Sequence, residues 1–390
     1  MQFHNFPRII RDMKFFKLVF FVTILLAGIL FIFIDPRRLD ASDFMLIAWT
    51  PAQELVRTGA VNADYPYPLW TLITLLPFTV WPFGISQLLW FIFNLFTLAA
   101  SLVVLIRVFE WNTSPVFFLS ILFLGGYFLP ILTSLWLGQL TIFLLLILVL
   151  TAYTFKHQQW TWLGIVLGLS FLKPQLMILL VGFLLLWSLW NRRWQVLTSF
   201  GLTMIFLVLI SLPFISSPSQ LIGGGIGYHL VTYLQKTSTI WGLLLVIGFP
   251  FWVPLIISLF LLGWIGYIWL LAPPRLDISP DRSNFLFSVT IIINLMIVPY
   301  SWMHNLTLLL LPFGYVLTLV LRMKSGARFF WSLLLFGIMH PLMLGVFFLF
   351  SIPDESQAYQ IIPAIALLPV IYYLELQSVS QNNRSGSEKV

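Results

Sequence analysis

Long apolar runs recur from one end of the chain to the other, and they constrain its fold more than any other feature. Of the 390 residues, 60% are hydrophobic and only 8% are charged, whereas a soluble domain carries about 25% charged residues. One aqueous core cannot bury so much apolar surface. Roughly 20 helical residues cross a hydrocarbon layer about 30 Å thick. We therefore expect an all-α polytopic membrane protein, with lipid as the solvent for most of the chain.

The apolar runs are numerous enough for about 12 transmembrane helices. We expect them to form a single domain over residues 1–376, followed by a disordered cytoplasmic tail at 377–390. An even number of spans places both termini on the same side of the membrane. The expected spans are 15–34, 83–107, 114–132, 136–155, 160–172, 174–190, 195–215, 250–271, 284–300, 305–321, 329–350 and 361–376.

Basic residues divide unequally between the two faces that these spans define. Fifteen of the 20 Lys and Arg residues fall on the side of the N-terminus. By the positive-inside rule this side is cytoplasmic, so we expect a multi-pass cell-membrane protein with both termini in the cytoplasm. The basic residues punctuate the apolar runs instead of forming a patch, which argues against nucleic acid as a partner. The outer face carries the other five, Arg37, Arg38, Arg57, Lys173 and Lys236.

The stretch 160–190 is too long for one ordinary span and carries a lysine near its middle. Lys156 precedes it and Arg193 follows it, so both of its ends favour the cytoplasm. That requires two short helices that run out and back, with the turn at Lys173-Pro174. The first helix is then about 20 Å long, so Lys173 is recessed below the outer membrane surface. A charge there faces protein or water, because facing hydrocarbon costs at least about 2.5 kcal/mol.

A large extracytoplasmic loop, 35–82, follows the first span. Within it, 48–57 predicts a short helix, and 69–81 is apolar but broken by prolines, which predicts a segment lying in the membrane interface. Asp40 and Asp43 stand at the membrane surface within nine residues of the first span. A carboxylate there can take a proton from a sugar hydroxyl while a membrane-embedded phosphate leaves, although most acids of an outer loop are only solvated.

Several short motifs follow one another along the chain, and their order is more informative than any one of them. The motifs are Asp43-Phe44, Ala48, Gly59 and Tyr65-Pro66-Tyr67-Pro68; Leu137-Gly138-Gln139; Gly164 and Gly168 leading to Leu172-Lys173-Pro174; and Pro299-Tyr300-Ser301-Trp302-Met303-His304. In this order they resemble the GT-C superfamily of integral-membrane glycosyltransferases, specifically glycosyltransferase family 87, over about residues 15–320. Thr141 and Asn305 depart from the family's pattern, which leaves the donor sugar open.

The resemblance implies transfer of a hexose, above all mannose, from a polyprenyl-phosphate donor to an extracytoplasmic lipid or glycan acceptor. It implies inversion, with one Asp of the first outer loop as base: Asp43, with Asp40 as its competitor. No cofactor and no metal are expected. Donor phosphate or sugar binding is expected at Lys173, His304, Gln139, Tyr67 and Tyr300.

Each of these binding residues also has a plainer interpretation. Lys173 can be a lysine that only marks a helix end, and His304 a polar residue of the membrane interface. Gln139 can cap or pack a helix start, and aromatic residues such as Tyr67 gather at membrane surfaces in any case.

Two alternative functions remain open at this point. A transporter or flippase of lipid-linked sugars also has about 12 spans and interrupted helices, but such carriers place ionisable residues in mid-membrane and show two similar halves. A glycan ligase or polymerase would share the lipid-linked substrate, and the number of phosphates on the donor separates it from the mannosyltransferase.

The topology can be tested by single-cysteine labelling, because the chain contains no cysteine of its own. We expect a cysteine at Ser42 to react with an impermeant maleimide in intact cells, and one at Ser325 to react only after permeabilisation. The opposite labelling pattern would reverse the assignment of the two faces.

Overall fold

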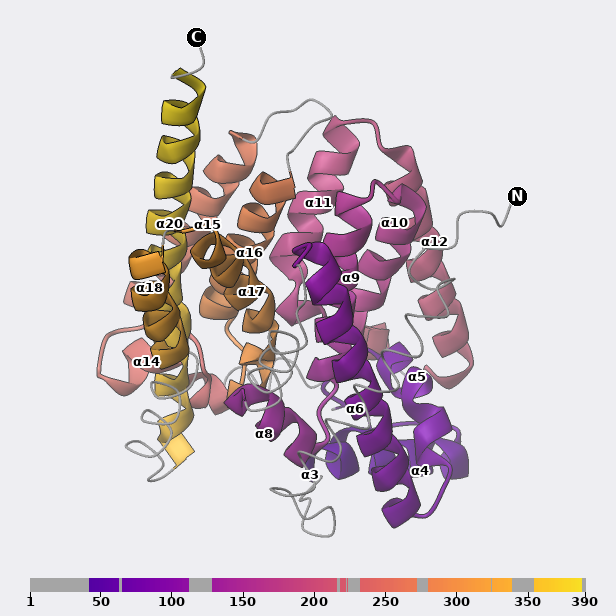
Figure 1. Cartoon of the computed structure of the whole chain (residues 1–390). Helices are drawn as coiled ribbons and strands as arrows, with labels where there is room; N and C mark the ends of the chain where they lie inside the picture. Colours follow the sequence, from indigo (N-terminus) through magenta and orange to yellow (C-terminus); the bar gives the residue numbers. More distant parts are fainter. Residues whose placement is uncertain are drawn as a thin grey trace. The chain divides into compact units, whose positions relative to one another are not determined.

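The computed structural model describes residues 42–62, 65–111, 128–215, 218–221, 223, 232–271, 280–323, 325–338 and 354–387 (Figure 1). Throughout these residues the regular structure is helical, without a strand, as the composition predicts. The chain divides into two compact units, 1–233 and 234–390. Each unit is described by itself.

The first unit starts with a continuous helical run and continues through a series of apolar helices. Its α and π elements are α3 (Ser42–Phe44), the π-helix η3 (Met45–Trp49), α4 (Thr50–Thr58), α5 (Leu69–Thr79), α6 (Phe83–Val108), α8 (Leu129–Leu137), α9 (Thr141–Lys156), α10 (Trp160–Leu169), α11 (Ile178–Trp190) and α12 (Trp194–Ser211). Its 3₁₀ turns are η4 (Ser170–Leu172), η5 (Pro174–Leu176), η6 (Leu212–Phe214) and η7 (Pro218–Leu221).

The second unit is built around α16, which packs against α15, α17 and α20. The indole of Trp269 donates to Thr290 Oγ1 (2.9 Å), a side-chain bond between α15 and α16. The elements are η8 (Leu234–Lys236), α14 (Ile240–Val246), α15 (Trp252–Leu270), α16 (Pro280–Ile297), η9 (Met303–Leu309), α17 (Leu310–Leu321), α18 (Ser325–Gly337), η11 (Asp354–Ile361) and α20 (Ile362–Ser387). The last helix continues beyond 377, where the sequence predicts a disordered tail.

Several of the described helices have the length and composition of membrane spans. Five are long and apolar enough to cross a bilayer: 83–108, 194–214, 252–270, 303–321 and 357–378. Shorter apolar helices cover 69–79, 141–156, 160–172, 178–190 and 326–337. The protein is therefore a helical membrane protein. Twelve spans stay a prediction, since 15–34 and most of 114–132 and 339–350 lie outside the described residues.

The reversal of the chain within 160–190 is confirmed by contacts between the two ends of this stretch. At the start of α10, the Trp160 ring lies 5.7 Å from the ring of Trp187, near the end of α11. The guanidinium of Arg193 stacks over the same Trp160 ring at 4.6 Å. The chain therefore reverses direction between these helices, and the reversal contains Lys173.

The expected span at 136–155 is wrong at its start. Leu137 ends α8, Gly138 takes a left-handed conformation (φ +70°), and α9 begins only at Thr141. Hydropathy misses this break because the residues on both sides of it are equally apolar. The short helix expected at 48–57 is likewise part of a longer helical run, 42–58.

Candidate functional site

The first helical run carries Asp43 in its first turn. After that turn the helix widens: the Thr50 N–H bonds to Met45 O, the spacing of a π-helix. Pro51 then has no N–H to give to Ile47 O, four residues earlier. Instead, the Tyr65 hydroxyl donates to Ile47 O (3.0 Å). Burial raises the pKa of the Tyr65 phenol, so this donor keeps its proton.

Gly138 holds the loop between α8 and α9 against the first helical run. A Cβ at this position would lie 2.7 Å from the Cβ of Phe44, so only a glycine permits the approach. The Trp90 indole of α6 donates to Gly138 O (2.7 Å) and also stacks on the Phe44 ring, with centroids 5.6 Å apart. These contacts place Gln139 beside Asp43, the residue before Phe44.

The turn before Lys173 is held by α5. The Trp70 indole donates to Phe171 O (2.9 Å), and the Thr71 hydroxyl donates to Leu172 O (2.7 Å). Two carbonyl groups that the irregular backbone of this turn leaves available are thereby satisfied. The segment 69–81, which the sequence places in the membrane interface, thus anchors the turn that presents Lys173.

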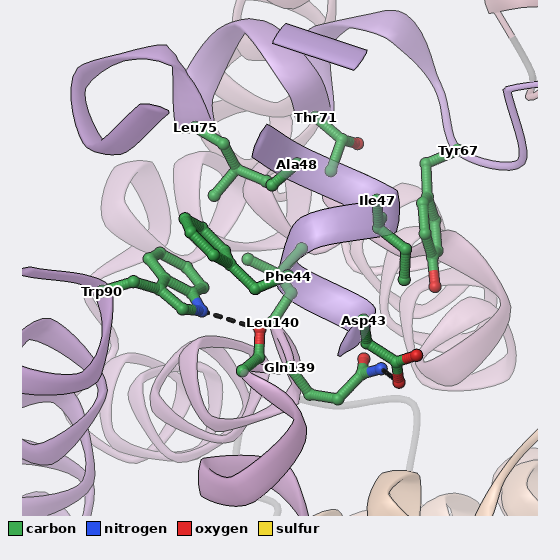
Figure 2. Close-up of a pocket in the computed structure, with 11 residues that line it drawn as sticks. Asp43, Phe44, Ile47, Ala48, Tyr67, Thr71, Leu75, Trp90, Gln139 and Leu140 are labelled. Carbon is green, nitrogen blue, oxygen red and sulfur yellow. Dashed lines mark hydrogen bonds between the residues drawn. The ribbon is translucent and has the colours of Figure 1, made fainter. Parts of the chain in front are cut away.

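Four of the residues proposed from the sequence come together in the first unit. The Gln139 side chain donates through Nε2 to Asp43 Oδ2, as Figure 2 shows. The Lys173 ammonium donates to Gln139 Oε1 (3.4 Å) and lies 5.6 Å from the centre of the Tyr67 ring. Lys173 is only 1% exposed. The cluster therefore joins a carboxyl group and a lysine amine through one neutral amide.

A pocket lies next to this cluster (Figure 2). Asp43 and Gln139 stand at one side of it, while Phe44 and Trp90 stand at another. The surface of this pocket is almost wholly apolar, and Asp43 and Gln139 are the polar side chains at its edge next to the cluster. The lining residues are Asp43, Phe44, Ile47, Ala48, Tyr67, Thr71, Leu75, Trp90, Gly138, Gln139 and Leu140.

Tyr300 and His304 belong to the second unit. The Tyr300 ring packs edge-on against Trp302, with centroids 5.8 Å apart. His304 is 5% exposed and stands in the first turn of the candidate span 303–321. The connection from Ile297 to Met303 is fixed by Ser238, whose N–H donates to Ser301 O (2.7 Å).

Two residues that contact the site carry no functional signal in the sequence. Trp90 and Thr71 stand within apolar helices, where an indole or a hydroxyl is typical of ordinary packing. Asp40, the competitor of Asp43, lies outside the described residues. A usable signal was the glycine before Gln139, since Gly commonly ends a helix in the left-handed conformation.

Comparison with known families gives one match. The model of glycosyltransferase family 87 matches residues 65–299, more than half of the chain. Tyr67, Gln139 and Lys173 lie inside the matched range, Asp43 precedes it, and Tyr300 and His304 follow it. Neither the curated proteins nor the solved structures give a match.

Replacement of Gly138 by alanine tests the close approach to Phe44. Gly59 is the matched control, because it is also left-handed (φ +75°) but has open space around it. We expect Gly59→Ala to cost about 1–2 kcal/mol for backbone strain, and Gly138→Ala to cost about 1–3 kcal/mol more for the clash. Thermal unfolding of the detergent-solubilised variants measures both, and equal losses would mean that the approach to Phe44 is not tight.

Proposed function

The chain belongs to glycosyltransferase family 87, and we propose that it transfers a hexose, mannose, from a polyprenyl-phosphate donor to a lipid or glycan acceptor. The reaction is a single inverting displacement on the extracytoplasmic side of the membrane. An acceptor hydroxyl forms a bond to the anomeric carbon as the bond from that carbon to the phosphate oxygen breaks. Asp43 takes the hydroxyl proton, and polyprenyl phosphate leaves as an anion.

The observation that carries this proposal is the assembly of Asp43, Gln139 and Lys173 beside one pocket. An inverting transfer needs one base for the attacking hydroxyl. It needs no general acid, since phosphate is a good leaving group. Asp43 is partly buried at the pocket wall and meets the first requirement.

Lys173 supplies the positive charge that the leaving phosphate requires. The departing group gains negative charge in the transition state, and a fixed cation in surroundings that exclude water stabilises that charge strongly. Lys173 is buried and held by Gln139 and by the Tyr67 ring. A lysine that only marked a helix end would extend toward water instead.

The location of basic residues within the first unit supports an extracytoplasmic site. The Lys156 ammonium bonds to Val108 O (2.6 Å), and Arg193 stacks on Trp160, so the basic ends of α6, α9, α10 and α11 form one end of this unit. The other end holds α8, α3, which contains Asp43, and α5, which bonds to the turn before Lys173 (Figure 1). By the positive-inside rule, the basic end faces the cytoplasm.

Three further residues are proposed to bind donor or acceptor: Tyr67 in the first unit, and Tyr300 and His304 in the second. An aromatic ring such as that of Tyr67 stacks on the apolar face of a sugar, and its place in the pocket wall suits that role. His304, at the start of a candidate span, binds phosphate when it is protonated or orients the acceptor. The family match favours this enzyme over a transporter of lipid-linked sugars.

Replacement of Asp43 by asparagine tests the base. Asparagine is nearly isosteric and still accepts a hydrogen bond, so the variant should fold and bind donor. Loss of a proton-transferring acid lowers the rate by about 10²–10⁴-fold. We expect this loss with polyprenyl-phosphate-[¹⁴C]mannose and a membrane lipid extract, while Asp40→Asn keeps substantial activity. The reverse ranking would move the base to Asp40, and full activity of both variants would contradict the mechanism.

Replacement of Lys173 by glutamine tests the phosphate contact. We expect transfer and donor binding to fall together, while the unfolding temperature and expression stay near those of the parent. Arg57→Gln is the matched control, since Arg57 is an exposed cation of the same unit and the same expected face. Normal donor affinity in Lys173→Gln would assign this residue to the structure and not to the donor.

A further inference from the structure

We propose that Gln139 is a positioning residue for the transfer reaction, and that it holds the Asp43 carboxylate ionised and aimed at the acceptor. This inference rests on the proposed function and on the part assigned there to Asp43. It differs from a direct contact between Gln139 and the sugar, because the side chain acts through Asp43.

The first step is the geometry of the amide bridge, by which we mean the two hydrogen bonds that the Gln139 side chain makes with Asp43 and Lys173. Gln139 uses both ends of its carboxamide: Nε2 donates to Asp43 Oδ2, and Oε1 accepts from the Lys173 ammonium at 3.4 Å. Its side chain is buried, with 4% of the residue exposed. A buried amide with charged groups at both ends is held in one position.

The second step is chemical, because the orientation of the amide follows from its neighbours. An ionised carboxylate only accepts hydrogen bonds, and an ammonium only donates them. A reversed amide would face Asp43 with an acceptor and Lys173 with a donor, and would lose both bonds. The bridge thus requires a side chain that donates at one end and accepts at the other, at the length of glutamine.

The third step is the fixed backbone beneath the bridge. The Gln139 N–H donates to Ser134 O (2.8 Å), and Trp90 holds the preceding carbonyl, that of Gly138. Gly138 itself packs against Phe44, the residue after Asp43. The backbone that carries Gln139 is therefore fixed beside the residue that follows Asp43.

The consequence concerns the protonation of the base. A hydrogen bond donated to a carboxylate favours its ionised form and lowers its pKa. The titratable groups of the described residues that face Asp43 are Lys173, across the bridge, and Tyr67, in the pocket wall. Without Gln139, Asp43 loses a donor, its pKa rises, and the base is protonated over a wider acidic range.

The test is the pH dependence of kcat in Gln139→Leu and Gln139→Glu. Leucine has a similar volume and no hydrogen-bonding group. Glutamate keeps the bond from Lys173 but sets a second carboxylate beside Asp43. In both variants we expect the acidic limb of the profile to move to higher pH by about one unit or more. We also expect kcat at neutral pH to fall at least tenfold, with the KM for donor nearly unchanged.

A matched control separates this effect from a general loss of packing. The Gln53 amide donates to Thr79 O (2.6 Å) in the same unit, and it has no part in the proposed machinery. Gln53→Leu should lower stability and leave the acidic limb in place.

The outcomes distinguish the two proposals. An unmoved acidic limb in both Gln139 variants overturns the positioning role, and a rise in donor KM at constant kcat identifies Gln139 as a sugar ligand instead. Neither result affects the assignment of the base, which depends on the comparison of Asp43→Asn with Asp40→Asn. If Gln139→Leu does not fold, Gln139→Glu decides the question by itself, because it keeps the side-chain length and the contact with Lys173.

Discussion

A lysine ammonium buried in a turn between two apolar helices is the constraint around which the first unit is arranged. Removal of a charge from water without a partner costs far more than any one hydrogen bond returns. Lys173 is 1% exposed, and its partners come from distant parts of the chain: the Gln139 amide, the Tyr67 ring and, across the amide, the Asp43 charge. The segments that carry these partners meet at this one point.

Two of the segments at that point interrupt helices, and the third is the first turn of a helical run whose spacing then changes. Gln139 follows the left-handed Gly138, Lys173 separates two 3₁₀ turns, and Asp43 precedes a π-helix. Irregular backbone at membrane depth needs partners inside the protein, because lipid offers none. Here α5 and α6 supply them through Trp70, Thr71 and Trp90. The same interruptions let polar side chains converge in a protein whose helices are almost wholly apolar.

The features of this site that follow from the positions of the basic residues could be predicted from the sequence. The reversal at Lys173 follows from Lys156 and Arg193 at the two ends of an overlong apolar stretch, and contacts between those ends confirm it. The break at Gly138 could not be found in the same way, because hydropathy does not register a change of backbone conformation between apolar neighbours. The hydrogen bond between Gln139 and Asp43 could not be predicted either, because 96 residues separate the two in the sequence.

Pro51 affects how the first helical run is joined to the segment that follows it. A residue with an N–H at position 51 would compete for Ile47 O, the acceptor that Tyr65 now uses. Because Pro51 has no N–H, the Ile47 carbonyl accepts a hydrogen bond from Tyr65, which lies 18 residues after Ile47. This one side-chain bond attaches the Tyr65–Pro68 segment, which includes Tyr67, to the first helical run.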